Sequence, residues 1–166
     1  MKSRYTRRLL ESIASGAASG AAGTLALHMT HEASYRYAPH TLPPMLCEPG
    51  HYMVDKAEAL LPRRTRNQVT TAERDTAASA LSFAYGALWP AIYLTLRGRH
   101  TSVLVDGVAL GVAVWGIGYL GWLPGLRLSP PVQQQTATQV VNNVAQHALY
   151  GVVTVAAWRG IRSLLD

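Results

Sequence analysis

The sequence predicts a single all-α domain over residues 1–166, a polytopic membrane protein with four transmembrane helices. Two observations carry this prediction. Charged residues make up only 14% of the chain, against roughly 25% in a typical soluble domain. They are also unevenly spread, because the stretch from residue 76 to residue 162 contains only Arg97, Arg99, Asp106, Arg127, Arg159 and Arg162. So few charges do not suit a soluble surface, and a lone cysteine, Cys47, excludes a disulfide scaffold.

Four windows have the length of about 20 mostly apolar residues that a transmembrane helix needs. Residues 103–123 form the strongest window, with Asp106 as its only charge, and residues 76–96 carry no charge. Residues 137–158 are weaker because they include several amides and a histidine. Residues 9–29 are the weakest by hydropathy, since Gly, Ala and Ser dominate them. The alternative is a soluble protein with long core helices, in which such uncharged stretches are rare.

The distribution of basic residues predicts that both termini face the cytoplasm. This orientation follows the positive-inside rule for short loops, because it places inside Lys2, Arg4, Arg7, Arg8, Arg97, Arg99, Arg159 and Arg162. The short outer link between spans three and four then has only Arg127. The long outer connection over residues 31–75 is basic, which long segments tolerate. Nucleic-acid binding is not expected, since no basic run is interleaved with stacking aromatics.

The long loop contains a predicted amphipathic helix. Its apolar residues recur at helical spacing up to Pro62, and they are Met53, Val54, Ala57, Leu60 and Leu61. We expect this helix to lie on the membrane surface or to plug the outer mouth of the bundle. Arg63, Arg64 and Arg66 follow it, and they either touch lipid phosphates or are simply solvated.

The two halves of the chain carry similar motifs in the same order. Gly16-x-x-x-Gly20 matches Gly107-x-x-x-Gly111, Leu42-Pro43-Pro44-Met45 matches Ser129-Pro130-Pro131-Val132, and Tyr85-Gly86 matches Tyr150-Gly151. This order indicates two repeated helical hairpins, while chance matching is the alternative in a chain rich in glycine and alanine. The glycines remove side-chain bulk and predict close helix packing. Pro90 is expected to kink the second span and to free a backbone carbonyl upstream.

Aromatic and acidic side chains mark the ends of the spans. Trp89, Trp122 and Trp158 lie toward span ends, as membrane anchors do. Glu11 and Asp106 lie near the cytoplasmic ends. For both we expect an ion pair with a neighbouring arginine, or a simple interfacial carboxylate, rather than a proton carrier.

Taken in order, these motifs resemble a known family. The features are the Gly-rich first span, the Pro-Pro turn, the Tyr-Gly motif, a Trp-rich third span ending Leu123-Pro124-Gly125-Leu126, and a final His147-x-x-Tyr150-Gly151 motif. They are similar to the YagU-like bacterial inner-membrane proteins, a domain of unknown function. The resemblance implies four helices in a bacterial inner membrane, and it implies no reaction. The chain departs from the pattern at Ser82, where members often have a histidine.

A polar stripe on the fourth span is the candidate site. Asn143, His147, Tyr150 and Thr154 are spaced by four, three and four residues, so they share one helical face. Together with Tyr85 of the second span they are candidates for a ligand-binding site or a proton path, with His147 as the titrating group. Polar groups in hydrocarbon must face the bundle or a cavity. The alternative is that these side chains only hydrogen-bond between helices and fix their packing.

Two weaker hypotheses concern cofactors. His28 and His147 are candidate axial ligands of haem b, but at 1.5 Å per residue they lie about 30 Å and about 18 Å from the cytoplasmic edge. His28, His31 and Glu32 are a candidate metal site near the outer surface, which would still need His40 or His51. We therefore expect no cofactor.

The sequence predicts function only coarsely. It contains no P-loop, Gly-x-Ser-x-Gly or His-Glu-x-x-His motif, so a non-enzymatic protein is expected. The leading hypothesis is a helical bundle that handles a small solute, an ion or protons, or that is a structural subunit of a larger membrane complex. The Gly-rich faces also fit a homo-oligomer. The alternative is a haem- or metal-binding electron-transfer protein that uses His28 and His147.

Overall fold

The computed structural model describes residues 2–97 and 102–165, and the regular elements of these residues are all helical. The helices are α1 (Lys2–Tyr37), η1 (Pro39–Thr41), α2 (Pro49–Ala59), α3 (Arg63–Arg66), α4 (Thr71–Arg97), α5 (Val103–Trp115), η2 (Gly116–Trp122), α6 (Leu123–Gly125), η3 (Val132–Gln134) and α7 (Ala137–Leu165). Of these, η1 and η3 are 3-10 helices and η2 is a π-helix. The all-α prediction is confirmed. Arg99, which was expected in the cytoplasmic link, lies outside the described residues.

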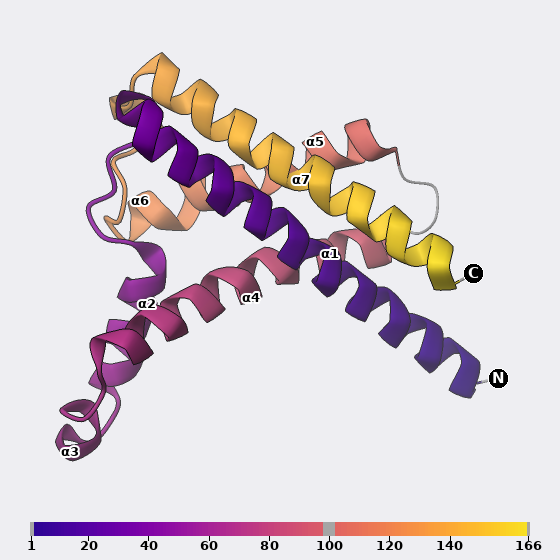
Figure 1. Ribbon diagram of the computed structural model, residues 1–166, viewed down its shortest axis with the longest axis horizontal. Coiled ribbons are helices and arrows are strands. Elements are labelled where there is room, and N and C mark those ends of the chain that lie inside the picture. Colours follow the sequence, from indigo (N-terminus) through magenta and orange to yellow (C-terminus); the bar gives the residue numbers. More distant parts are fainter. Residues whose placement is uncertain (1, 98–101, 166) are drawn as a thin grey trace.

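The central helix of the bundle is α1. It packs against both α4 and α7, and α5 packs against α7. Figure 1 shows α1 and α7 side by side, with α4 crossing α1 at an angle. The N- and C-terminal ends lie at the same end of the bundle, while α2 and α3 lie at the far end of α4 (Figure 1).

Two helical stretches are long and apolar enough to cross a membrane. They are Thr71–Arg97 and Val103–Gly125, which contain the expected windows 76–96 and 103–123. Only 22% and 33% of their most apolar windows are buried, so most of each apolar surface faces outward. The core helix of a soluble protein would be mostly buried. The other two expected windows lie within α1 and α7, which are not among these two stretches.

Reciprocal capping starts α4 and α7. The backbone N–H of Thr70 donates to the Glu73 carboxylate over 2.8 Å, and the Glu73 N–H donates back to the Thr70 hydroxyl over 3.3 Å. Thr136 and Gln139 repeat this arrangement, with distances of 2.9 and 3.3 Å. Each pair satisfies two N–H groups that the first turn of a helix leaves without acceptors. The local sequence therefore determines where these two long helices begin.

Glycines lie where the helices cross. A Cβ built on Gly20 would stand 2.6 Å from the Gly86 carbonyl oxygen, and one built on Gly16 would stand 2.7 Å from the Cα of Ala91. On the other side of the bundle, a Cβ on Gly107 would stand 2.6 Å from the Cα of Val152. Real Cβ atoms do not approach backbone so closely, so only glycine allows these crossings. Such contact is how helices associate where lipid is as apolar as the side chains.

The surface of the bundle is largely apolar, and its interior contains polar side chains beside an apolar core. Side chains buried in the interior include Ser15, Ser19, Thr24, Asp106, Asn143, Gln146 and Thr154. Large apolar side chains on the surface include Leu25, Met29, Leu88, Leu96, Leu104, Val108, Leu120, Val141 and Leu149. The anchor prediction for Trp158 is wrong, since this side chain is 3% exposed and packs with Leu94, Leu110 and Tyr150.

Residues 48–75, which we call the arm, project from the far end of α4 (Figure 1). The buried face of α2 is formed by Gly50, Val54 and Glu58. Of the apolar residues that predicted an amphipathic helix, Val54 is buried, Met53 and Ala57 are exposed on α2, and Leu60 and Leu61 follow its end. Their placement on a membrane surface stays a prediction. Ion pairs as well as apolar contact hold α2 on α4.

Two groups of charges join α2 to α4 within the arm. His51 bridges two carboxylates, with Nδ1 2.7 Å from Glu48 and Nε2 2.9 Å from Asp75. Arg74 forms ion pairs with Glu58 and Asp55. Beyond the His51 group, Gly50 lies so close to α4 that a Cβ would stand 2.8 Å from the Ala78 carbonyl oxygen. The arm is therefore fixed to the start of α4.

Replacing a glycine by alanine should lower the free energy of unfolding only where the added Cβ meets another helix. Gly151→Ala places a methyl group on the carbonyl oxygen of Gly107. We expect a loss of about 1–3 kcal/mol in the free energy of unfolding, measured in detergent micelles, because α5 and α7 must separate. Gly160→Ala on the same helix is the control, since nothing lies within 4 Å of the added Cβ. It should be neutral or stabilising, because alanine favours helix. Equal stability of the two variants would contradict the prediction.

His51 should make attachment of α2 to α4 depend on pH. Hydrogen bonds to Asp75 and then Glu48 raise the pKa of His51 above its ordinary value of about 6.5. Its stabilising effect is therefore complete below that value and is lost as the pH rises through the raised pKa. Hydrogen exchange of α2 amides, corrected for intrinsic rates, should accelerate on this rise, and His51→Gln should abolish the dependence. The same acceleration in the variant would refute the assignment.

Candidate functional site

The polar stripe of α7 faces the interior of the bundle. Asn143 is 4% exposed, Tyr150 1% and Thr154 0%, and His147 is half-buried. The helical spacing that predicted a shared face therefore places these side chains against the neighbouring helices. What decides their role is whether their polar atoms are free or already paired.

Tyr150 pairs with the carbonyl that Pro90 leaves free. Proline has no N–H, so the carbonyl four residues earlier, that of Gly86, loses its helical donor. The Tyr150 hydroxyl crosses from α7 and donates to this oxygen over 2.6 Å. A buried carbonyl without a donor costs about 1–3 kcal/mol, so this bond joins α7 to α4 at a point where α4 needs it.

His147 contacts its own helix and the π-helix η2. Its Nδ1 lies 2.9 Å from the Asn143 carbonyl oxygen, and because a carbonyl only accepts, Nδ1 donates. In the neutral ring Nε2 then carries the lone pair. The ring meets Tyr119 edge to face at 5.8 Å, and Tyr119 stacks on Trp115 at 6.4 Å. The Tyr119 side chain is also adjacent to that of Asn143. Tyr119 gave no signal in the sequence, because only the wider turns of η2 bring it to α7.

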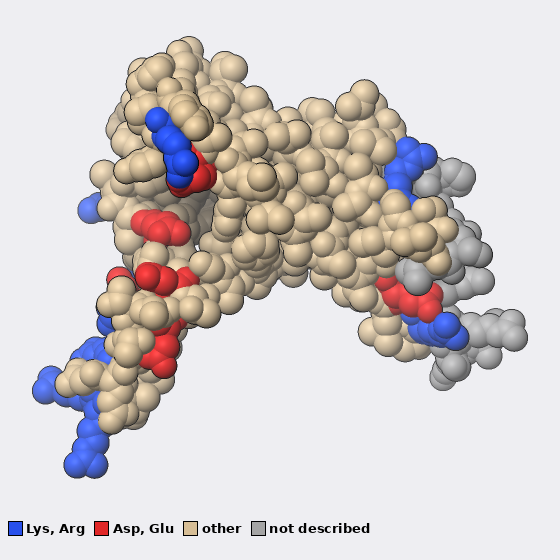
Figure 2. Space-filling view, in the orientation of Figure 1, with Lys and Arg blue, Asp and Glu red and all other residues tan. Residues whose placement is uncertain are grey.

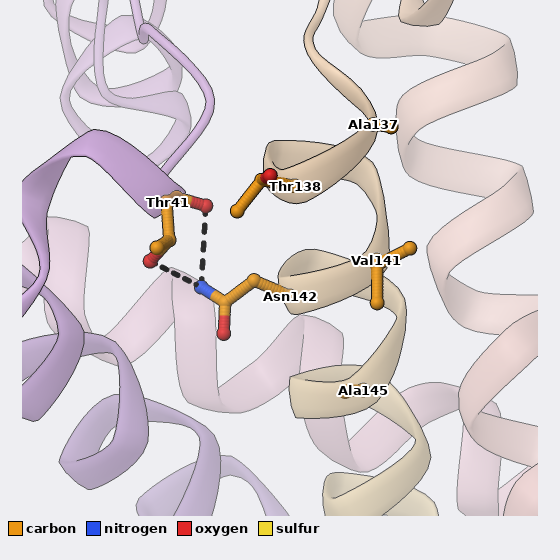
Figure 3. A pocket seen from close by; sticks show the side chains of 6 residues that line it. All are labelled: Thr41, Ala137, Thr138, Val141, Asn142 and Ala145. Atoms are coloured by element: carbon orange, nitrogen blue, oxygen red, sulfur yellow. Dashed lines mark hydrogen bonds between the residues drawn. The ribbon is translucent and has the colours of Figure 1, made fainter.

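The residues that border the stripe tie α7 to η1 and to the C-terminal part of α1. The Asn142 amide donates to the Thr41 carbonyl over 3.2 Å and lies 3.0 Å from the Thr41 hydroxyl. Figure 3 shows both contacts beside a shallow depression between η1 and the first turns of α7. One turn further along, the Gln146 amide donates to the Ser34 hydroxyl over 2.8 Å. These amides therefore connect helices, and the depression is open to the surface.

Tyr85 lies near the stripe without a hydrogen bond to its members among the described residues. Its hydroxyl accepts from the indole N–H of Trp122 over 3.2 Å, and its ring lies edge to face with Trp89 and Trp122 at 5.9 Å each. Tyr85 also packs against the core cluster that contains Tyr150. Its role in the structure is to join α4 to η2.

The two candidate haem ligands, His28 and His147, contact different helices. His28 is exposed and meets Phe83 on α4 at 5.4 Å, whereas the ring of His147 meets Tyr119 on η2. Glu32 is paired with Arg36 over 3.0 Å. Within residues 2–97 and 102–165, no three His, Cys, Asp or Glu side chains are grouped so that they could hold a metal ion. His51, an expected addition to the metal group, instead belongs to the arm.

Asp106 is the centre of a second polar cluster, at the opposite end of the bundle. Its carboxylate is 2% exposed and accepts from Arg97 over 2.7 Å, from the Tyr93 hydroxyl over 2.9 Å and from the Ser102 N–H over 2.5 Å. The prediction of an ion pair with a neighbouring arginine is confirmed. Glu11 likewise pairs with Arg7 over 2.8 Å. Both acidic side chains therefore form ion pairs with an arginine of the same chain.

Comparison with protein-family models, curated proteins and solved structures found no match to this chain.

The pairing of Tyr150 with the carbonyl freed by Pro90 predicts coupling between the two positions. Tyr150→Phe should lower the free energy of unfolding by about 1 kcal/mol or more, because it leaves the Gly86 carbonyl without a donor. In a Pro90→Ala background residue 90 regains its N–H, so the same substitution should cost less. A double-mutant cycle of unfolding free energies measures the difference. Tyr119→Phe, on η2, serves as the control and should show no dependence on Pro90. Additive effects at positions 90 and 150 would contradict the pairing.

Proposed function

We propose that the chain spans a membrane four times, through α1, α4, the segment α5–η2–α6, which is kinked at Gly121, and α7. The observation that carries this proposal is the largely apolar surface of the bundle, together with the polar side chains in its interior. In support, each of the four contains a stretch without Asp, Glu, Lys or Arg, over residues 12–31, 76–96, 107–125 and 137–158. About 20 helical residues extend about 30 Å, which is the thickness of the hydrocarbon core. Figure 2 shows an uncharged middle between two charged ends.

The proposed orientation has both termini in the cytoplasm and the arm outside. It agrees with the basic residues of the short links and with the position of both chain ends at one end of the bundle (Figure 1). The proposed location is a bacterial inner membrane, and membership of the YagU-like family, with its repeated hairpins, stays a prediction from the order of the motifs. Gly16, Gly20 and Gly86 join α1 to α4, and Gly107, Gly111 and Gly151 join α5 to α7, as two such hairpins require.

Within the membrane we propose a non-enzymatic structural role, as a closed bundle that acts as a subunit of an assembly. Tyr150 of the polar stripe and the two amides that border it support this role, because their polar groups are engaged within the protein. Tyr150 satisfies Gly86, Asn142 binds Thr41, and Gln146 binds Ser34. The helices that surround the stripe meet at glycines with backbone in contact, which leaves little room for a path along it.

One observation supports solute or proton handling as a second candidate. The amide nitrogen of Asn143 is buried and has no hydrogen-bond partner within the described residues. It lies beside His147, whose Nε2 is the lone-pair nitrogen of the neutral ring. A small polar solute could bind between these two groups. A visible absorption spectrum distinguishes the haem alternative with His28 and His147, since bis-histidine haem gives a strong band there.

Reconstitution into liposomes tests the structural role. We expect His147→Ala to lower the free energy of unfolding by about 1 kcal/mol, through loss of its interhelical contacts, and to leave proton flux at the level of protein-free liposomes. Leu149→Ala, at an exposed position one turn from Ala145, is the matched control on α7. Flux above that level in the native chain, abolished by His147→Ala but kept in Leu149→Ala, would replace the structural role by a proton path.

A further inference from the structure

The end of the arm carries a cationic tip, which we define as Arg63, Arg64 and Arg66 together with the adjoining Leu60 and Leu61. The arginines form α3, a single turn that follows Pro62. Figure 2 shows basic side chains gathered at this end of the molecule, beyond the acidic side chains of the arm. The tip combines positive charge with exposed apolar surface. Charge alone would keep this end soluble, but it does not account for the exposed leucines.

The acidic side chains of the arm contact residues other than the arginines of the tip. His51 engages Glu48 and Asp75, and Arg74 engages Glu58 and Asp55. Glu73 caps α4 through Thr70. By contrast, no ion pair formed within the described residues includes Arg63, Arg64 or Arg66. Three guanidinium groups therefore lie together without an internal counter-ion.

The leucines of the tip distinguish its ligand from a simple anion. Leu60 is 87% exposed and Leu61 is 40% exposed, and both come directly before Pro62 and the arginines. A free phosphate ion would gain nothing from two exposed leucines. A lipid surface offers phosphate groups to the arginines and an apolar layer just below them to the leucines. Arginine suits phosphate because its planar fork can donate two parallel hydrogen bonds.

The arm is attached to α4 at the edge of its uncharged stretch. This stretch begins at Thr76, directly after Asp75, and Gly50 of α2 is held against Ala78. The start of α4, Thr71, lies five residues before Thr76, which is about 7.5 Å along the helix. Charged groups at that distance from an anionic surface are within the Debye length of about 8 Å at physiological ionic strength. The arm that carries the tip therefore begins within the field of an anionic bilayer surface, and α3 lies at its end (Figure 1).

We propose that the cationic tip binds the phosphate groups of anionic phospholipids on the outer face of the membrane and so holds the arm on the bilayer surface. This inference rests on the proposed membrane insertion. The ligand class is a phospholipid with net negative charge, recognised by its phosphate through the arginines and by its acyl region through the leucines. The tip gives the outer end of the bundle a second attachment to the membrane, besides its helices.

A spin label near the tip tests the proposal in the full-length chain. The label is placed at Asn67→Cys, an exposed position directly after α3, in a Cys47→Ser background. The chain is reconstituted in nanodiscs of phosphatidylcholine alone or with increasing phosphatidylglycerol. We expect phosphatidylglycerol to immobilise the label and shield it from an aqueous nickel reagent, and high salt to reverse both effects.

Substitutions then assign the effect to the tip. Replacing all three arginines by glutamine should weaken the association of the tip with phosphatidylglycerol roughly 100-fold, since each basic side chain at an anionic surface contributes about 1 kcal/mol. The label should then stay mobile at every phosphatidylglycerol content. Leu60→Ser with Leu61→Ser should weaken the effect to a smaller extent. The matched control, Arg36→Gln with Lys56→Gln and Arg127→Gln, removes the same charge from other exposed positions and should leave the response nearly intact.

Each other outcome overturns the proposal in a recognisable way. A label insensitive to phosphatidylglycerol, or a response that survives loss of the three arginines, rejects the lipid site. Immobilisation by inorganic phosphate in neutral nanodiscs shows a free-anion site instead. Failure of the chain to enter neutral nanodiscs contradicts the proposed membrane insertion, and it does so before the tip is examined, so the two failures are distinguishable.

Discussion

Contact between helix backbones is the constraint on which the remaining interactions of this bundle depend. Gly16 and Gly20 allow α4 to lie against α1, and Gly107 and Gly151 allow α5 to lie against α7. Lipid tails are as apolar as leucine, so no hydrophobic force draws helices together inside a bilayer, and dispersion contact has to supply the attraction. The polar contacts follow from this spacing. The Tyr150 hydroxyl reaches Gly86, and His147 meets Tyr119, only because their helices are this close.

Polar side chains in the interior form hydrogen bonds within the protein and so hold the helices at defined positions. Hydroxyl groups on α1 bond back to their own helix, as Ser19 does to Gly16 and Thr24 to Gly20, which removes their cost in an apolar setting. Asp106 gathers Arg97, Tyr93 and Ser102 at one end, and the amides of α7 fasten the other end to α1. This arrangement supports the proposed structural role, whereas the second candidate function relies on the buried Asn143 amide nitrogen, which has no hydrogen-bond partner within the described residues.

Sequence rules predicted the features that depend on neighbouring residues. The starts of the third and fourth spans at Val103 and Ala137, and the carbonyl freed by Pro90, follow from local rules of helix formation. The donor to that carbonyl could not be found in this way, because Tyr150 reaches Gly86 only through the crossing of α7 with α1 and α4. For the same reason Trp158 was expected at the membrane surface and lies in the core. The π-turns of η2 that bring Tyr119 to His147 have no local signature.

The bond between Tyr150 and Gly86 has a consequence for how the chain is made. In the proposed membrane topology, α1 and α4 are synthesised before α7, so the Gly86 carbonyl has no donor from Pro90 and none yet from Tyr150 when α4 enters the bilayer. The first two long helices would then remain incomplete until another donor or the last helix reaches this carbonyl. Translation of the last helix ends that wait, and the same event brings Thr154 against Gly23 of α1. Biogenesis of this bundle is thus completed from its C-terminal end.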